Sequence, residues 1–167
     1  MELYREYLVD ERNYTSYEDL KKNFKLKIPE NFNFAYDIVD RYAKEEPEKR
    51  ALVWCDDNGD EKIFTFAQIA EASKKTAYFL TAHGIKKGDA VMLILRRRYE
   101  FWWFMLAIHR IGAIAVPATE QLLVKDIEYR NNAAGIKMIV SFDKPTLQQE
   151  IENACKSSST VKELVTV

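Results

Sequence analysis

The sequence predicts an α/β fold with a doubly wound, mainly parallel sheet and a separate β-hairpin. From Thr65 onward, helical patterns alternate with short apolar runs, as in sheets whose strands are joined by helices. An Asn58-Gly59 pair, a short hairpin signal because both residues tolerate positive φ, precedes this alternation. The 167 residues are 47% hydrophobic and 31% charged, which is typical of a globular chain with a real core.

Residues 1–30 are predicted to form an N-terminal extension that packs on the body formed by residues 31–167. Thr15 or Ser16 can cap a short helix running towards Phe24, because acidic side chains follow and favour the positive helix end. The first ten residues lack a basic stretch followed by an apolar core, so no signal peptide is expected.

The body is expected to begin with a helix and a hairpin. Phe34, Ile38 and Tyr42 recur every fourth residue, which predicts a helix that ends near Pro47. The elements expected next are a strand over 51–55, the Asn58-Gly59 turn and a return strand over 62–66.

The parallel sheet is expected to follow a helix that Thr65 and Gln68 start with a capping box and Gly84 ends. Residues 90–95 are apolar throughout, which predicts a strand covered on both faces. The later predictions are helices over 99–110, 126–133 and 146–154, and strands over 114–117, 138–142 and 164–167.

Composition excludes several classes of partner. The net charge of −1 gives no field that would attract nucleic acid or acidic lipid. The densest apolar stretch, 101–118, is interrupted by polar and glycine residues and predicts a buried helix and strand, not a membrane span. Cys55 and Cys155 are too far apart to suggest a disulfide framework, so we expect a cytoplasmic setting.

Familiar catalytic motifs are absent from the sequence. The five glycines are too dispersed for a phosphate-binding loop, and no GxSxG nucleophile elbow occurs. His83 and His109 are interpreted as surface or packing residues in preference to catalytic bases. No catalytic residue and no metal ligand is therefore predicted in this chain.

Two charged runs each allow two interpretations. Asp56 to Asp60 resembles a calcium loop, but its glycine comes fourth instead of sixth, so a solvated hairpin turn is preferred. Arg96-Arg97-Arg98 follows a strand at the sheet edge where ligands bind in doubly wound folds. The alternative, which we prefer, is a cationic helix start whose arginines pair with nearby carboxylates.

Several short patterns occur together in one order over residues 31–167. They are Asn33-Phe34-Ala35 with Asp37 and Asp40; Trp54 and Phe64 to Ile69; Gly84 to Val91; Arg97, Glu100, Trp102, Arg110, Gly112 and Pro117; and Thr119, Gln121, Asp126-Ile127, Tyr129-Arg130 and Ile139-Val140. Together they resemble the N-terminal subdomain of adenylate-forming enzymes, and most of all the medium-chain acyl-CoA synthetases.

The stretch from Glu100 to Arg130 discriminates most, because it separates acyl-CoA synthetases from amino-acid-activating relatives, which usually carry an acidic residue soon after the proline. Here the proline is followed by Ala118-Thr119-Glu120-Gln121, as in the medium-chain group. There are also departures from the medium-chain group. Arg96 and Tyr99 stand where that group usually has prolines, Ala118 stands where it has glycine, and Glu120 replaces an apolar residue. Losing the prolines changes how the chain enters the helix, and the changes at Ala118 and Glu120 alter the shape and charge expected of the nearby pocket.

The resemblance implies that residues 31–167 are an incomplete AMP-binding domain of an ATP-dependent acyl-CoA synthetase. Such enzymes convert a small carboxylic acid to acyl-AMP and transfer the acyl group to coenzyme A, with ATP and Mg²⁺. The segments that hold ATP are not in this sequence, so the chain alone is expected to be inactive and to bind no cofactor tightly. Its partner would be the rest of the same polypeptide.

By the same resemblance, Gln121 and Thr119 lie on the coenzyme A side of the site. A glutamine amide can both donate to and accept from the pantetheine or the adenine. A loop-capping glutamine without a ligand is an equal alternative.

Two other functions remain open from the sequence. The chain could be a stand-alone, non-catalytic module that binds coenzyme A, an acyl-CoA or a protein partner. A flavodoxin-like domain is the third possibility, although no cofactor loop is present. The apolar end from Leu164 to Val167 also predicts self-association through a truncated sheet edge.

Overall fold

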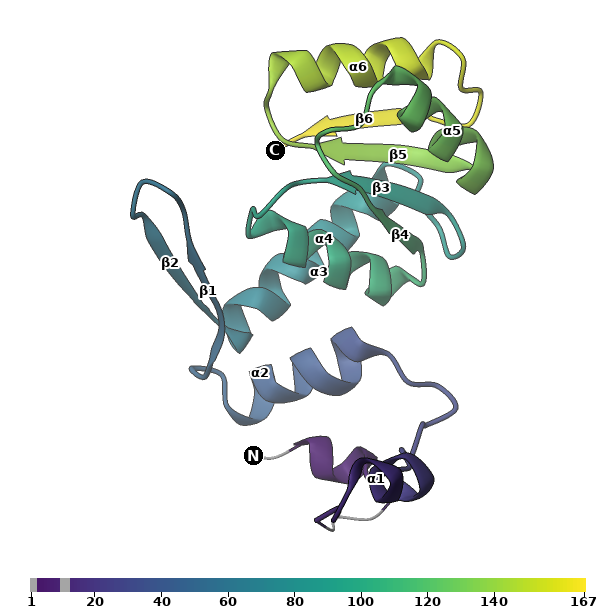
Figure 1. The fold of residues 1–167 in the computed structure, drawn as a ribbon. Helices are drawn as coiled ribbons and strands as arrows, with labels where there is room; N and C mark the ends of the chain where they lie inside the picture. Colours follow the sequence, from purple (N-terminus) through teal and green to yellow (C-terminus); the bar gives the residue numbers. More distant parts are fainter. Residues whose placement is uncertain (1–2, 10–12) are drawn as a thin grey trace.

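The computed structural model describes residues 3–9 and 13–167, and Figure 1 presents its fold. The predictions for residues 1–2 and 10–12, which belong to the expected N-terminal extension, lie outside the described residues. Within the described ranges, no helix combines the length and the apolar character needed to cross a bilayer.

The body is a four-stranded parallel sheet covered by helices on both faces (Figure 1). Its strand order is β4-β3-β5-β6, with bounds Ile114–Pro117, Ala90–Ile94, Ile136–Ser141 and Glu163–Thr166. Helices α5 (Val124–Ala134) and α6 (Pro145–Cys155) cover one face, and α3 (Phe66–Ala82) and α4 (Glu100–Ile111) cover the other. The predicted doubly wound α/β architecture is confirmed, and these elements begin and end within two residues of the predicted bounds.

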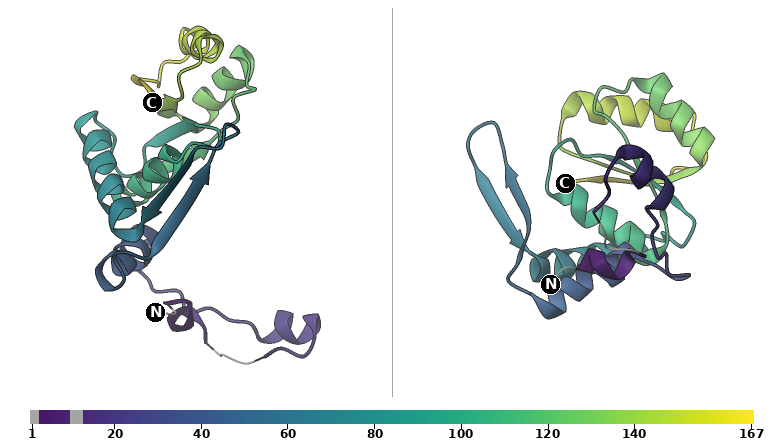
Figure 2. Two further views of the ribbon diagram at one scale, coloured as in Figure 1. Left: turned by 90° about the vertical axis from the view of Figure 1, so that its left-hand side faces the viewer. Right: turned by 60° about the horizontal axis from the view of Figure 1, so that its bottom comes forward.

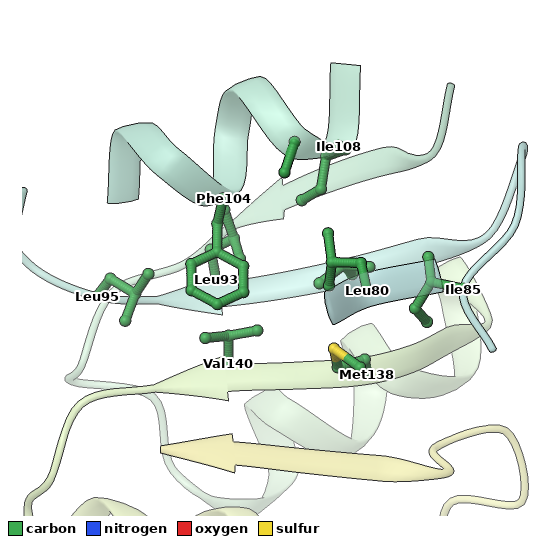
Figure 3. Close-up of a cluster of buried hydrophobic side chains, with 10 residues drawn as sticks. Leu80, Ile85, Leu93, Leu95, Phe104, Ile108, Met138 and Val140 are labelled. Carbon is green, nitrogen blue, oxygen red and sulfur yellow. The ribbon is translucent and has the colours of Figure 1, made fainter. Parts of the chain in front are cut away.

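Strand β3 is the centre of the core, because it is buried at every position. Successive side chains of a strand point to opposite faces, so β3 supplies two hydrophobic layers. Val91 and Leu93 pack with α3 and α4, and Figure 3 shows Leu93 beside Leu80, Phe104 and Ile108. The other layer packs beneath α5 and α6 and includes Ala90, Met92, Ile94, Ile127, Ile139 and Ile151.

The hairpin formed by β1 (Arg50–Cys55) and β2 (Glu61–Thr65) stands away from the parallel sheet (Figure 2). Its turn differs from the expected two-residue form, since five residues separate the strands. Asp56 organises this turn, because its Oδ1 accepts hydrogen bonds from the backbone N–H groups of Asn58 and Asp60, both at 2.9 Å. Gly59 has φ +89°, whereas Asn58 does not adopt positive φ.

The helix predicted over 34–47 is present but begins differently. Ala35–Asp40 is a π-helical segment, and α2 (Arg41–Glu45) continues it. The four-residue spacing of apolar side chains did not predict this wider first turn. The segment packs Ala35 and Val39 against α3 and α4, in a third core cluster with Ile69 and Leu106.

The N-terminal part of the chain lies beyond α2, at the opposite end from the parallel sheet (Figure 1). It contains a 3₁₀ helix, Leu3–Tyr7, and helix α1 (Tyr17–Asn23). Ser16 caps α1 by accepting a hydrogen bond from the backbone N–H of Asp19 at 3.1 Å, as one of the two predicted caps. Glu6 forms an ion pair with Arg41, and Tyr7 meets Phe32 edge to face.

Candidate ligand-binding site

The strands are all parallel, but the side on which the chain adds its next strand changes between β3 and β5, which makes this place the topological switch point of the sheet. From β3 the chain crosses through α4 to β4, and from β5 it crosses through α6 to β6 on the other side. Helices α4 and α6 cover opposite faces of the sheet (Figure 1), and in such folds a crevice is expected at the carboxyl ends of the two strands between them, here β3 and β5. The loops after these strands, 95–99 and 142–144, therefore border the place where doubly wound folds bind ligands.

A hollow of about 550 Å³ lies at this crevice. The hairpin forms one wall, and the loops after β3, β4 and β5 form the others. Its lining residues are Trp54, Cys55, Asp56, Asp57, Arg96, Arg97, Arg98, Thr119, Glu120, Gln121 and Phe142. The structure thus brings both predicted site residues, Thr119 and Gln121, to the hollow with the arginine run.

Thr119 and Gln121 belong to a six-residue loop, 118–123, between β4 and α5. Thr119 Oγ1 accepts a hydrogen bond of 3.3 Å from the backbone N–H of Gln121, which tightens the turn. Leu122 is buried and fixes the loop to the core below α5 and α6. Both predicted residues are exposed, and within the described ranges no hydrogen bond engages the Gln121 side chain. The amide is therefore available to a ligand.

The arginine run has two ion pairs. Arg96 Nε lies 2.8 Å from Glu120 Oε1, and Arg98 lies 2.7 Å from Glu100. The expected pairing with nearby carboxylates is confirmed for these two arginines. Arg97 is joined to the hairpin instead, because its backbone carbonyl accepts a hydrogen bond from Trp54 Nε1 at 2.6 Å.

Arg96 also has an unusual backbone, with φ +49°, the one positive φ outside glycine among residues 3–9 and 13–167. Left-handed backbone is disfavoured for side chains with a Cβ. The guanidinium of Arg96 lies 5.9 Å from the centre of the Phe142 ring, and Glu120 pairs with it from the facing loop. This conformation turns the chain sharply at the end of β3.

Sequence reasoning missed Lys144. Its Nζ lies 2.9 Å from Glu120 Oε2, so one carboxylate joins the loops after β3, β4 and β5. The signal was present, because Lys144 comes soon after the end of β5 at Ser141, and Arg96 comes soon after the end of β3 at Ile94. The switch-point rule would have placed both cations at one edge.

The histidines and the acidic turn lie as interpreted from the sequence. His83 is exposed beside Phe79, and His109 is half-buried against Phe34. Asp56 to Asp60 is a hairpin turn.

The described part of the chain contains no group of three or more His, Cys, Asp or Glu residues that could hold a metal ion. Cys55 and Cys155 are free thiols.

Comparison with known proteins decides the family. A sequence model described as "AMP-binding enzyme" matches residues 39–167. The chain belongs to the AMP-binding enzyme family.

Similar proteins agree with this membership. The chain is 38% identical to "Acyl-coenzyme A synthetase ACSM3, mitochondrial" of Mus musculus over 84% of its own length, and 38% identical to its Homo sapiens counterpart over 79%. The alignments cover 26% and 24% of those relatives, so the chain spans about a quarter of their length.

A solved structure supports the fold of this member of the family. A Mycobacterium tuberculosis fatty acyl CoA synthetase superposes with a TM-score of 0.68 at 23% sequence identity. The match covers 81% of this chain and 26% of that structure. At this identity, the likeness concerns the fold alone.

Proposed function

We propose that this chain is the N-terminal part of an ATP-dependent acyl-CoA synthetase. In the full-length protein, a carboxylate oxygen of a small carboxylic acid would attack the α-phosphate of ATP and release pyrophosphate. The thiolate of coenzyme A would then attack the acyl carbonyl and release AMP. Membership in the AMP-binding family and the acyl-CoA synthetase relatives support this proposal.

ATP and Mg²⁺ are proposed as ligands of the full-length protein and not of these residues. Two like charges meet when a carboxylate approaches a phosphate, and Mg²⁺ with cationic side chains offsets their repulsion. The described part of this chain offers no cluster of metal ligands. As from the sequence alone, we assign to this chain the scaffold and one edge of the site, and no catalytic residue.

The observation that carries the assignment is the position of Gln121. It is exposed on a loop whose ends are anchored, at the hollow beside the switch point, with its side chain available. Its amide could donate to and accept from coenzyme A, and Thr119 sets the shape of the turn. Binding residues often lie on loops that a rigid sheet positions in this way.

Gln121→Ala in the full-length protein tests the assignment. We expect the Michaelis constant for coenzyme A to rise several-fold, while ATP–pyrophosphate exchange stays nearly unchanged, because acyl-AMP forms before coenzyme A reacts. Gln149→Ala, an exposed glutamine on α6, is the matched control. An unchanged coenzyme A constant removes Gln121 from the site and leaves it as a loop residue.

A stand-alone module that binds coenzyme A or acyl-CoA without catalysis is the second candidate. The same exposed amide and hollow favour it, since both are present without any ATP-binding segment. Titration of this chain with coenzyme A separates the candidates. Micromolar affinity in the isolated chain favours the module, whereas affinity that appears only in the full-length protein favours the synthetase.

Self-association of two copies of the chain is part of the same proposal. Strand β6 lies at an edge of the sheet, and exposed edge strands can pair with another copy. Light scattering over a concentration series would detect such dimers, and a constant monomer mass would exclude them.

We propose a cytoplasmic setting, although the relatives are named as mitochondrial. Imaging of the tagged full-length protein decides between the compartments.

A further inference from the structure

The carboxylate of Glu120 closes the crevice between the loops that follow β3 and β5. Arg96 contacts Oε1 at 2.8 Å from one side, and Lys144 contacts Oε2 at 2.9 Å from the other. Only 19% of the Glu120 side chain is exposed, against 57% for Arg96 and 45% for Lys144. One largely covered carboxylate thus contacts two cations, Arg96, which lines the hollow, and Lys144 of the loop after β5.

The positive and negative side chains that line the hollow are equal in number only when Glu120 is counted among them. Three arginines and three carboxylates line it, the other acids being Asp56 and Asp57 of the hairpin. Asp56 already accepts hydrogen bonds within its own turn, and Glu100 engages Arg98. Glu120 is therefore the lining acid that contacts the cations of both switch-point loops.

The loop geometry lets Glu120 leave without unfolding its surroundings. The Ala118 backbone N–H donates to the Leu93 carbonyl at 2.9 Å, and Leu122 is buried, so both ends of the loop are fixed. Between these anchors, Thr119 and Gln121 are exposed. A movement that frees the carboxylate needs to displace only the three residues at the loop tip.

We propose that Glu120 is an internal competitor that occupies Arg96 and Lys144 until a phosphate-bearing ligand displaces it. A phosphate offers the same cations charge-assisted hydrogen bonds of the same kind, with more oxygen acceptors than a carboxylate. The two loops would then hold the ligand from opposite sides of the crevice. The identification of that ligand as coenzyme A rests on the proposed function, whereas the competition itself does not.

The test compares wild type with Glu120→Gln in the 167-residue chain. Glu152→Gln on α6 is the matched control, because it removes the same charge from an exposed site away from the crevice. Each protein is titrated with inorganic pyrophosphate and with coenzyme A by calorimetry at low salt. We expect roughly fivefold tighter binding of at least one probe to Glu120→Gln, and wild-type binding by the control.

Two further measurements make the result specific. Lys144→Gln in the Glu120→Gln background should abolish the gain, because the freed cation would be missing. Amide hydrogen exchange of residues 119–121 should be faster in Glu120→Gln than in wild type, even without ligand. This second readout distinguishes the release of the loop from a simple change in net charge.

The outcomes separate this inference from the proposed function. A gain for pyrophosphate without one for coenzyme A supports the competition and argues against coenzyme A as the ligand of this hollow. Equal or weaker binding of both probes by Glu120→Gln overturns the inference, and so does undetectable binding of both. A gain that Glu152→Gln reproduces also overturns it, since the effect would then come from net charge.

Discussion

The indole Nε1 of Trp54 donates a hydrogen bond of 2.6 Å to the backbone carbonyl of Arg97. This contact joins the hairpin to the loop after β3, which lie 43 positions apart in the sequence. Tyr99 packs edge to face against the Trp54 ring and strengthens the same junction. The hairpin is therefore held as one wall of the hollow, although it shares no strand pairing with the parallel sheet.

Trp54→Phe should loosen that wall without removing the aromatic packing. The substitution deletes one hydrogen-bond donor, and we expect a loss of about 1 kcal/mol in the free energy of unfolding. Urea denaturation measures the loss, and faster amide exchange in β1 locates it. Trp102→Phe is the control, because Trp102 is exposed on α4. A stability equal to wild type would mean that ring contacts alone hold the hairpin.

A second long-range contact joins the π-helical segment Ala35–Asp40 to α4. The guanidinium of Arg110 donates hydrogen bonds of 2.6 and 2.8 Å to the carboxylate of Asp40, and its Nε donates to Ser73 Oγ at 2.9 Å. The Arg110 side chain is only 3% exposed. Asp40→Ala leaves a buried cation without its counter-ion and should cost about 3 kcal/mol of stability.

Chemical denaturation of Asp40→Ala checks this value, with Glu152→Ala as a control that removes an exposed carboxylate. The control should differ from wild type by less than about 0.5 kcal/mol. A loss for Asp40→Ala as small as that of the control would show that Ser73 and the Tyr36 ring, 5.1 Å from the guanidinium, suffice for Arg110.

The same ion pair predicts a pH dependence of stability. Burial raises the pKa of Asp40, but the hydrogen bonds and charge of Arg110, together with Lys74, outweigh this and hold the pKa below its ordinary value of 3.8. The folded state therefore binds this proton less tightly than the unfolded chain. The pair stabilises the fold above about pH 4 and loses that contribution as the pH falls through the lowered pKa.

Asp40→Asn isolates this contribution, because the amide cannot titrate. The difference in unfolding free energy between wild type and Asp40→Asn should be constant from pH 7 to about pH 5, and should shrink as the pH falls below about 4. Denaturation at a series of pH values measures it. A difference that does not change down to pH 3 would mean that the folded and unfolded pKa values of Asp40 are equal.

Local sequence signals predicted the elements, because their causes are local. Thr65 and Gln68 form the expected capping box, and the uninterrupted apolar run of β3 is buried on both faces. The contacts of the site have causes far apart in the chain. Glu120 meets Lys144 only after the parallel strands place their carboxyl ends at one edge, so no spacing in the sequence predicts the pair.

The position of the loop 118–123 is easier to predict from the sequence than the ion pairs around it. The resemblance predicts Thr119 and Gln121 as site residues, and the structure places them at the hollow. In the sequence, Glu120 differs from the medium-chain group only by replacing an apolar residue, whereas in the structure it pairs with both Arg96 and Lys144. The sequence predicts a paired side chain for Arg96, but nothing in it predicts the left-handed backbone, since arginine carries no preference for that conformation.

The left-handed backbone of Arg96 predicts that glycine is more stabilising than alanine at position 96 and less stabilising than alanine at position 97. Arg96→Ala and Arg96→Gly both remove the pair with Glu120, but only glycine relieves the left-handed conformation at φ +49°. Arg96→Gly should therefore be more stable than Arg96→Ala by about 1 kcal/mol. At Arg97, where φ is not positive, glycine should be the less stable of the two, because it adds entropy to the unfolded chain. Thermal and urea unfolding of the four variants measure both differences, and glycine being less stable at both positions would show that the chain after β3 relaxes out of the left-handed region.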